Sequence, residues 1–133
     1  MILDSSAIVS VILREKGSDR VLDTMETAES CRIGAPTLVE TAMVLTGRLG
    51  DDGRTILLSL LQEINVDVLS FGDAHWRIAQ SAFVRYGKGR HPAALNFGDC
   101  LTYATAYVAG EPLLCVGEDF TQTDLELALP PAS

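Results

Sequence analysis

Four acidic side chains occur at or near the points where the apolar segments of this sequence are expected to end as strands. They are Asp4, Glu40, Asp99 and Asp119. The carboxyl ends of parallel strands meet at one edge of a sheet, so we expect the four carboxylates to converge. Carboxylates brought together repel one another, and either their pKa values rise or a cation is held between them. Oxygen donors without His or Cys favour Mg²⁺ or Mn²⁺ over zinc, and such an ion can activate water for attack on a phosphodiester.

Each acid also has an ordinary structural interpretation. Asp4 directly precedes an expected helix and can cap it. Thr37 and Glu40 have the spacing of a capping box, and Asn96 can cap the helix whose first turn contains Asp99. Capping is the favoured role of Asp4 or Glu40 considered alone. The metal-site hypothesis therefore depends on the four acids acting together.

Short apolar runs alternate with longer segments of helical periodicity. The expected strands cover residues 1–4, 32–35, 66–69 and 113–116. The expected helices cover residues 5–14, 17–29, 36–49, 51–64, 72–86 and 97–109, with a weak helix at the carboxyl terminus. This alternation predicts a central parallel sheet covered by helices on both faces, a three-layer α/β/α sandwich. In such sheets the functional crevice lies at the carboxyl ends of the strands.

Length and composition narrow the class of protein. The chain has 133 residues and no stretch of about 20 apolar residues, so we expect one soluble, cytoplasmic domain over residues 1–133 with no membrane contact. Cys31, Cys100 and Cys115 are odd in number and lie in apolar surroundings, which is typical of reduced core thiols. His75 and His91 have no ligand spacing to any cysteine, so zinc is not expected.

The distribution of charge limits how the chain can bind nucleic acid. The formal net charge of −8 argues against attraction over the whole surface. One dense run of positive charge, Arg85, Lys88, Arg90 and His91, lies just upstream of Asp99. It is either a solvated loop or a set of phosphate contacts, and its place beside Asp99 favours contact with an RNA strand. Aromatic residues are few, and helical spacing predicts that Trp76 belongs to the core.

Four segments together resemble the PIN domain, and specifically the VapC-type toxins of bacterial toxin–antitoxin pairs. They are MILDSSAIV, PTLVETAMVL, YGKGRHPAALNFGDCLTYA and PLLCVGEDFTQTDL. The resemblance covers nearly the whole chain and keeps the order and spacing of the acids. It implies an α/β/α sandwich, an endoribonuclease that depends on Mg²⁺ or Mn²⁺, a homodimer, and neutralisation by a cognate VapB-type antitoxin.

The resemblance also implies roles for individual residues. Asp4 and Asp99 correspond to the chief metal ligands, and Glu40 to a further ligand or a group that positions water. The fourth acid corresponds to Asp119, although Glu118 and Asp124 are close by; Asp124 also has the spacing of a local cap after Thr121. Ser6 and Asn96 match positions that support the ligands.

Two other functions fit an α/β scaffold. A phosphatase or phosphotransfer domain with an aspartate nucleophile at a strand end usually carries a second acid two residues later, whereas Ser5 and Ser6 follow Asp4. Lys88 lies in the wrong segment for a receiver domain. A non-catalytic interaction protein would have no need of all four carboxylates. The apolar character of segments 5–14 and 37–64 predicts a surface for a dimer or for an amphipathic antitoxin helix, and an antitoxin arginine entering the acidic pocket would suit the charge.

Overall fold

The computed structural model of the chain describes residues 1–130. Its strands are β1 (Ile2–Leu3), β2 (Arg32–Gly34), β3 (Asp67–Leu69) and β4 (Leu113–Leu114). Its helices are α1 (Ser5–Ile12), α2 (Ser18–Thr27), α3 (Ala35–Leu49), α4 (Asp52–Ile64), α5 (Asp73–Tyr86) and α6 (Phe97–Ala109). The alternation expected from the sequence is confirmed, with ends that differ by at most two residues.

The strands form one parallel sheet in the order β3-β2-β1-β4. The chain first adds strands on one side of β1 and then crosses to the other side to form β4. The carboxyl ends of β1 and β4 are therefore the point where the strand order reverses. A crevice opens at such a point in an open α/β sheet, because the connections leave in opposite directions.

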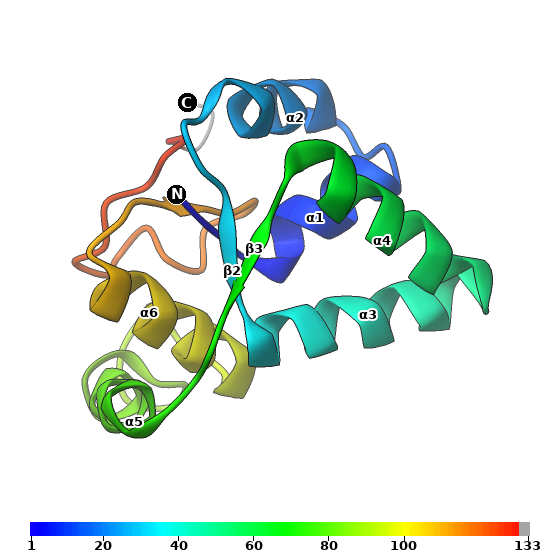
Figure 1. Cartoon of the computed structure of the whole chain (residues 1–133). Coiled ribbons are helices and arrows are strands. Elements are labelled where there is room, and N and C mark those ends of the chain that lie inside the picture. Colours follow the sequence, from blue (N-terminus) through cyan, green and yellow to red (C-terminus); the bar gives the residue numbers. More distant parts are fainter. Residues whose placement is uncertain (131–133) are drawn as a thin grey trace.

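Alternating side chains of the strands enter two separate cores. Ile2 and Leu113 pack with α5 and α6 on one face, whereas Leu3, Ile33 and Leu114 pack with α1 to α4 on the other. Figure 1 shows α5 and α6 together on one side of β2 and β3, with α3 and α4 on the opposite side. The expected three-layer α/β/α sandwich is confirmed.

The buried face of α5 differs from the expected one. Trp76 was predicted to be in the core, and this is wrong: it is 51% exposed, and its indole N–H donates to Asp73 Oδ1 at 2.9 Å. The buried face consists of Ala79, Ala82 and Tyr86. Two alanines allow α5 to approach α6 closely, and the larger Trp76 is left at the rim of the contact.

The segment after β4 consists of turns followed by a single bridge between Leu127 and Leu113, where a weak helix was expected. The N–H of Leu113 donates to the carbonyl of Glu126 at 2.9 Å, and the N–H of Ala128 donates to the carbonyl of Leu113 at 2.8 Å. The prediction of a helix is thus wrong up to residue 130, and residues 131–133 lie outside the described part. The segment bonds the outer edge of β4 at Leu113 through a single bridge to Leu127, and this contact occupies part of an edge that could otherwise pair with another strand.

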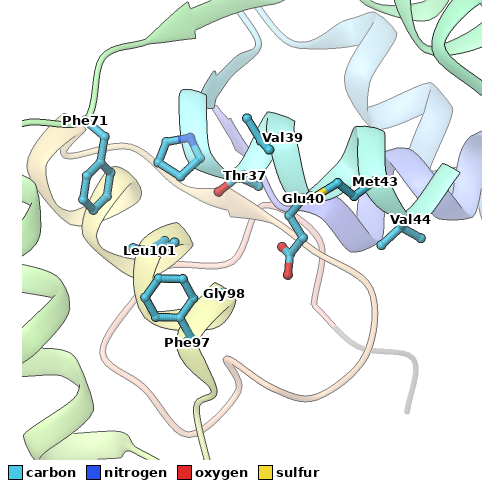
Figure 2. Close-up of a pocket in the computed structure, with 10 residues that line it drawn as sticks. Thr37, Val39, Glu40, Met43, Val44, Phe71, Phe97, Gly98 and Leu101 are labelled. Atoms are coloured by element: carbon cyan, nitrogen blue, oxygen red, sulfur yellow. The ribbon is translucent and has the colours of Figure 1, made fainter. Parts of the chain in front are cut away.

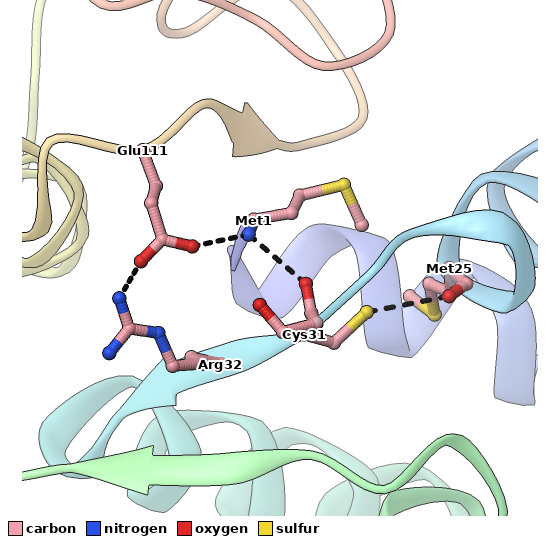
Figure 3. A network of polar contacts seen from close by, with 6 residues as sticks. Met1, Met25, Cys31, Arg32 and Glu111 are labelled. Atoms are coloured by element: carbon pink, nitrogen blue, oxygen red, sulfur yellow. Dashed lines mark hydrogen bonds and ion pairs between the residues drawn. The ribbon is translucent and has the colours of Figure 1, made fainter.

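An ionic network ties three strands together at the amino ends of the sheet. The amino group of Met1 donates to Glu111 Oε1 at 2.5 Å and to the carbonyl of Ser30 at 3.1 Å. The other carboxylate oxygen of Glu111 pairs with Arg32 of β2 (Figure 3). Glu111 precedes β4, so this residue links the amino ends of β1, β2 and β4.

None of the helices in residues 1–130 is long and apolar enough to cross a bilayer.

Candidate active site

Asp4 lies at the carboxyl end of β1 and caps α1. Its Oδ2 accepts hydrogen bonds from the backbone N–H of Ser6 at 3.2 Å and from the Ser6 hydroxyl at 2.6 Å. Its Oδ1 accepts from the Thr102 hydroxyl at 2.9 Å. The capping role predicted for Asp4 is confirmed, and these bonds fix the orientation of a carboxylate that is only 7% exposed. Ser6 also accepts from the N–H of Val116, which joins the ends of β1 and β4.

Two buried threonines support the acids; Thr102 was not predicted from the sequence, and Thr37 was assigned only to a capping box. The hydroxyls of Thr37 on α3 and Thr102 on α6 lie 3.1 Å apart, and Thr102 continues the chain of bonds to Asp4. Thr37 is three residues before Glu40, and Thr102 is three residues after Asp99. This spacing places each threonine on the same helix face as an acid, which is the signal that could have identified them.

Asp99 lies in the first turn of α6, where Asn96 caps the helix. The N–H of Asp99 donates to Asn96 Oδ1 at 2.9 Å, and Asp99 Oδ2 accepts from the N–H of Asn96 at 3.0 Å. The expected cap at Asn96 is confirmed. Burial raises the pKa of Asp99 to about 6, and the negative charges of Asp119, Asp4 and Glu40 add to the effect, while the bond from Asn96 opposes it. The other three acids predicted from the sequence therefore lie close enough to Asp99 to affect its charge.

Glu40 projects from α3 against the start of α6. Figure 2 shows its side chain pointing toward Gly98, which directly precedes Asp99. A Cβ atom on Gly98 would overlap the Glu40 carboxylate, so the glycine gives this acid its place beside Asp99. The predicted capping box of Thr37 and Glu40 is wrong. The helix begins at Ala35 with Gly34 as its cap, so Thr37 lies inside the helix, and its hydroxyl bonds Thr102.

The candidates for the fourth acid separate in space. Asp119 acts on the charge of Asp99 and also on the buried thiol of Cys115. Asp124 lies elsewhere, since its Oδ1 accepts from the Tyr103 hydroxyl at 2.6 Å and its Oδ2 pairs with Arg85 at 3.5 Å. The predicted local cap at Asp124 is therefore wrong, because the side chain serves this tertiary contact.

The donor atoms of the cluster are oxygens. Burial raises the pKa of Cys115 to about 12, with further contributions from Asp4, Asp119 and Asp99, so this thiol stays protonated at neutral pH and is a poor metal ligand. Within residues 1–130, no three His, Cys, Asp or Glu side chains already converge as the ligands of one metal ion. The four acids form an open group in which the negative charges of Asp119, Asp4 and Glu40 repel that of Asp99. That donor set fits a hard divalent cation that keeps several water ligands.

The basic residues begin with Arg85 in the last turn of α5 and continue into the loop between α5 and α6. Arg85 pairs with Asp124 and covers the ring of Tyr86, with the guanidinium carbon 4.7 Å from its centre. His91 Nδ1 accepts from the N–H of Ala93 at 3.0 Å. Arg90 lies over the ring of Phe83, and Lys88 is exposed. Arg85 and His91 thus have structural partners within the chain, and contact of the loop with RNA stays a prediction.

A groove of about 660 Å³ runs beside the acids between α3 and α6. Glu40 and Thr37 are polar residues of its lining, and Val39, Met43 and Phe97 contribute apolar side chains beside them (Figure 2). Met43 is 70% exposed and Phe97 is 80% exposed. Exposed apolar side chains gathered in one groove are typical of a contact surface. The apolar excess expected in segment 37–64 is present, and segment 5–14 is mostly packed against the core.

A family model described as the PIN domain matches residues 1–126. The chain belongs to the PIN-domain family. The PIN domain is 50% identical over 127 residues to Ribonuclease VapC36 of Mycobacterium tuberculosis, covering 95% of this chain and 91% of that relative. It is 37% identical over 131 residues to Ribonuclease VapC30 of the same species, covering 98% and 100%.

Solved structures show the same fold. The PIN domain matches the sarcin–ricin loop cleaving toxin VapC20 of M. tuberculosis with a TM-score of 0.77 and 17% identity, over 98% of both chains. It matches VapBC2 of Rickettsia felis, solved bound to a DNA fragment from its promoter, with a TM-score of 0.76 and 12% identity, over 99% of this chain and 98% of that one. Metal dependence is a general property of PIN-domain nucleases of the VapC type.

Proposed function

We propose that this PIN domain is an endoribonuclease and the toxin of a toxin–antitoxin pair. The observation that supports this most directly is the cluster at the carboxyl ends of β1 and β4, where Asp4, Glu40 and Asp119 all act on the charge of Asp99. Relatives that share 50% and 37% of its residues over nearly the whole chain are named ribonucleases. The family match favours a nuclease over a phosphotransfer domain.

Mg²⁺ is the proposed cofactor, and Mn²⁺ is an alternative with the same ligand preference. Asp4 and Asp99 are the proposed ligands, with Glu40 and Asp119 as further ligands or water-holding groups. The bound ion would lower the pKa of a water molecule and offset the negative charge that develops on the phosphate.

The chain's own residues have distinct proposed roles around that chemistry. Ser6 and Thr102 orient both oxygens of Asp4, and Asn96 does the same for one oxygen of Asp99. Glu40 is half-buried beside the start of α6, where it can hold a water molecule and accept its proton during attack on phosphorus. The basic residues Arg85, Lys88, Arg90 and His91 are proposed to contact the RNA backbone.

The proposed partners are a VapB-type antitoxin, an RNA substrate and a second copy of the chain. One similar solved structure, from Salmonella typhimurium, is a DNA-bound VapBC assembly, which supports pairing with an antitoxin. The groove between α3 and α6 offers an apolar surface for a second copy. An antitoxin arginine directed at Glu40 and Asp99 would block the acids and relieve their repulsion.

The test is cleavage of cellular RNA by the purified chain with Mg²⁺, followed by sequencing of the new ends. Asp4→Asn and Asp99→Asn should abolish cleavage, because each removes a carboxylate ligand while keeping its shape. Asp119→Asn should do the same, whereas the nearby substitutions Glu118→Gln and Asp124→Asn should keep activity. Cleavage that survives in an Asp4→Asn, Asp99→Asn double variant would contradict the metal mechanism.

A further inference from the structure

A second hollow lies behind the loop that leads to Asp119. Its volume is about 260 Å³. It is lined by Ser10 of α1, by Lys16, Gly17 and Arg20 around the start of α2, and by the Val116–Glu118 segment after β4. Nothing in the proposed chemistry of the four acids uses this hollow.

Positive charge dominates the side of the hollow formed by α2. Lys16 and Arg20 are exposed, and neither takes part in an ion pair within residues 1–130. The amino end of α2 begins at Gly17, which has no side chain to cap it, so the partial positive charge of the helix end adds to the two cations. Glu118 contributes one negative charge to the lining, and Asp19 lies in the first turn of α2. Among the residues that line the hollow, two are cationic and one is anionic, in a chain whose net charge is −8.

A buried hydroxyl with no partner lies in the wall of the same hollow. Ser10 is 1% exposed, and its Oγ has no hydrogen-bond partner in the described part of the chain. A buried hydroxyl without a partner is destabilising, and such groups in native proteins call for a reason such as a bound ligand. A phosphate oxygen would accept a hydrogen bond from this hydroxyl.

The hollow shares a wall with the acidic site. Val116 lines the hollow, and its N–H donates to Ser6, which in turn donates to Asp4. Gly117 and Glu118 also line the hollow and immediately precede Asp119. The segment that lines the hollow is thus bonded to the residues that hold Asp4 and leads directly into Asp119.

We propose that this hollow is a second phosphate subsite for the RNA backbone, formed by Lys16, Arg20 and Ser10. The proposal rests on the proposed function, because it takes RNA as the ligand. It assigns to the start of α2 a sequence-independent contact that sets the register of the strand across the acids.

The first experiment measures binding of a fluorescent oligouridine to the Asp4→Asn chain, so that the probe is not cut. Lys16→Ala and Arg20→Ala should each weaken binding several-fold. The slope of log K against log salt concentration should fall by about 0.7 for each phosphate that the variant no longer neutralises. Arg54→Ala removes an exposed arginine on α4 that does not line the hollow, and it should leave both the affinity and the slope unchanged.

The second experiment needs no nuclease activity. Inorganic phosphate is titrated into the full wild-type chain without metal while NMR records the amide signals of Gly17, Ser18 and Gly117. These signals should shift and saturate, and the shifts should be absent in the Lys16→Ala, Arg20→Ala double variant. Ser10→Ala should fold at least as well as the wild type and bind phosphate more weakly.

The outcomes separate the two proposals. Saturable phosphate binding in a chain that cuts no RNA would leave the subsite standing and overturn the proposed function. Cleavage of RNA by a chain whose Lys16 and Arg20 variants bind oligouridine with unchanged affinity and salt slope would overturn the subsite. Variants that lose only antitoxin binding would assign the hollow to a protein partner and likewise overturn it.

Discussion

Asp4 and Asp99 differ in how their carboxylates are held. Ser6 and Thr102 donate hydroxyl hydrogens to Asp4, while Asp99 receives one backbone N–H and faces three like charges. Hydrogen bonds to an ionised carboxylate favour its charged form, and nearby negative charges disfavour it. Hydrogen bonds therefore fix the orientation of the Asp4 carboxylate, whereas burial and nearby negative charges raise the pKa of Asp99.

Removal of the Thr102 hydroxyl should weaken the site through Asp4. Thr102→Val keeps the shape of the side chain but leaves Asp4 Oδ1 and Thr37 without their bond. We expect the Mg²⁺ concentration for half-maximal cleavage to rise about 10- to 100-fold. Loss of the buried bonds should lower the free energy of unfolding by about 1–3 kcal/mol. Thr102→Ser retains the hydroxyl and should restore the Mg²⁺ dependence. An unchanged Mg²⁺ dependence in Thr102→Val would show that the bond has no positioning role.

The raised pKa of Asp99 should appear in the pH dependence of stability without metal. The folded chain keeps the Asp99 proton up to about pH 6, while the unfolded chain loses it near the ordinary pKa of 3.8. The folded state binds more protons over this range, so the Asp99 contribution to the free energy of unfolding falls as the pH rises from 4 to 6. Since Asp99 is partly exposed, we expect a decrease of about 1 kcal/mol.

Urea unfolding in EDTA at several pH values measures this effect. Asp99→Asn has no such proton, so the unfolding free energy of the wild type minus that of the variant should decrease from pH 4 to pH 7. Mg²⁺ should restore the wild type at pH 7. Parallel pH curves for the two proteins would contradict the assignment.

The close approach of α3 and α6 determines the position of the Glu40 side chain. Gly98→Ala places a methyl group where the Glu40 carboxylate lies. The carboxylate is the end of a flexible side chain and can move away at small cost to the fold. We therefore expect cleavage to fall at least about 10-fold, with the free energy of unfolding changed by less than about 1 kcal/mol.

A matched glycine on α3 provides the control for this prediction. Gly47 lies in the interior of the helix, and open space surrounds the position of its missing Cβ. Gly47→Ala should stabilise the chain by about 0.5–1 kcal/mol and leave cleavage unchanged. Equal activity of the Gly98→Ala and Gly47→Ala proteins would refute the role assigned to the contact between Glu40 and Gly98.

The elements and the acids were predictable from local patterns, whereas their contacts were not. Short apolar runs and helical periodicity are local properties, and Asp4 and Asp99 are marked by their place at a strand end and a helix start. The bond between Thr37 and Thr102 joins residues 65 positions apart, so no local pattern contains it. The exposure of Trp76 was missed for the same reason, because helical spacing alone does not say which apolar stripe meets α6.

The groove between α3 and α6 is the surface that we propose for binding a second copy of the chain. Met43→Ser combined with Phe97→Ser should shift the chain toward a monomer in analytical ultracentrifugation at micromolar concentration, because serine cannot replace the apolar area that the two exposed side chains offer to a partner. Ile56→Ser combined with Leu58→Ser alters two exposed apolar residues of α4 and should leave association unchanged. Association that disappears only in the α4 variant would assign the dimer contact to α4 and contradict the role of the groove.

The division of the interior into two cores has a dynamic consequence. Asp4 and Glu40 belong to the layer of α1 to α4, while Asp99 is carried by α6 in the opposite layer. Cooperative units that open separately in amide hydrogen exchange tend to follow such divisions. Local unfolding of α5 and α6 alone would move Asp99 away from the other acids while the rest of the chain stays folded. The proposed metal ligands thus lie in two packing layers. A partner that changes how often one layer opens can change the separation of the ligands without touching an acid.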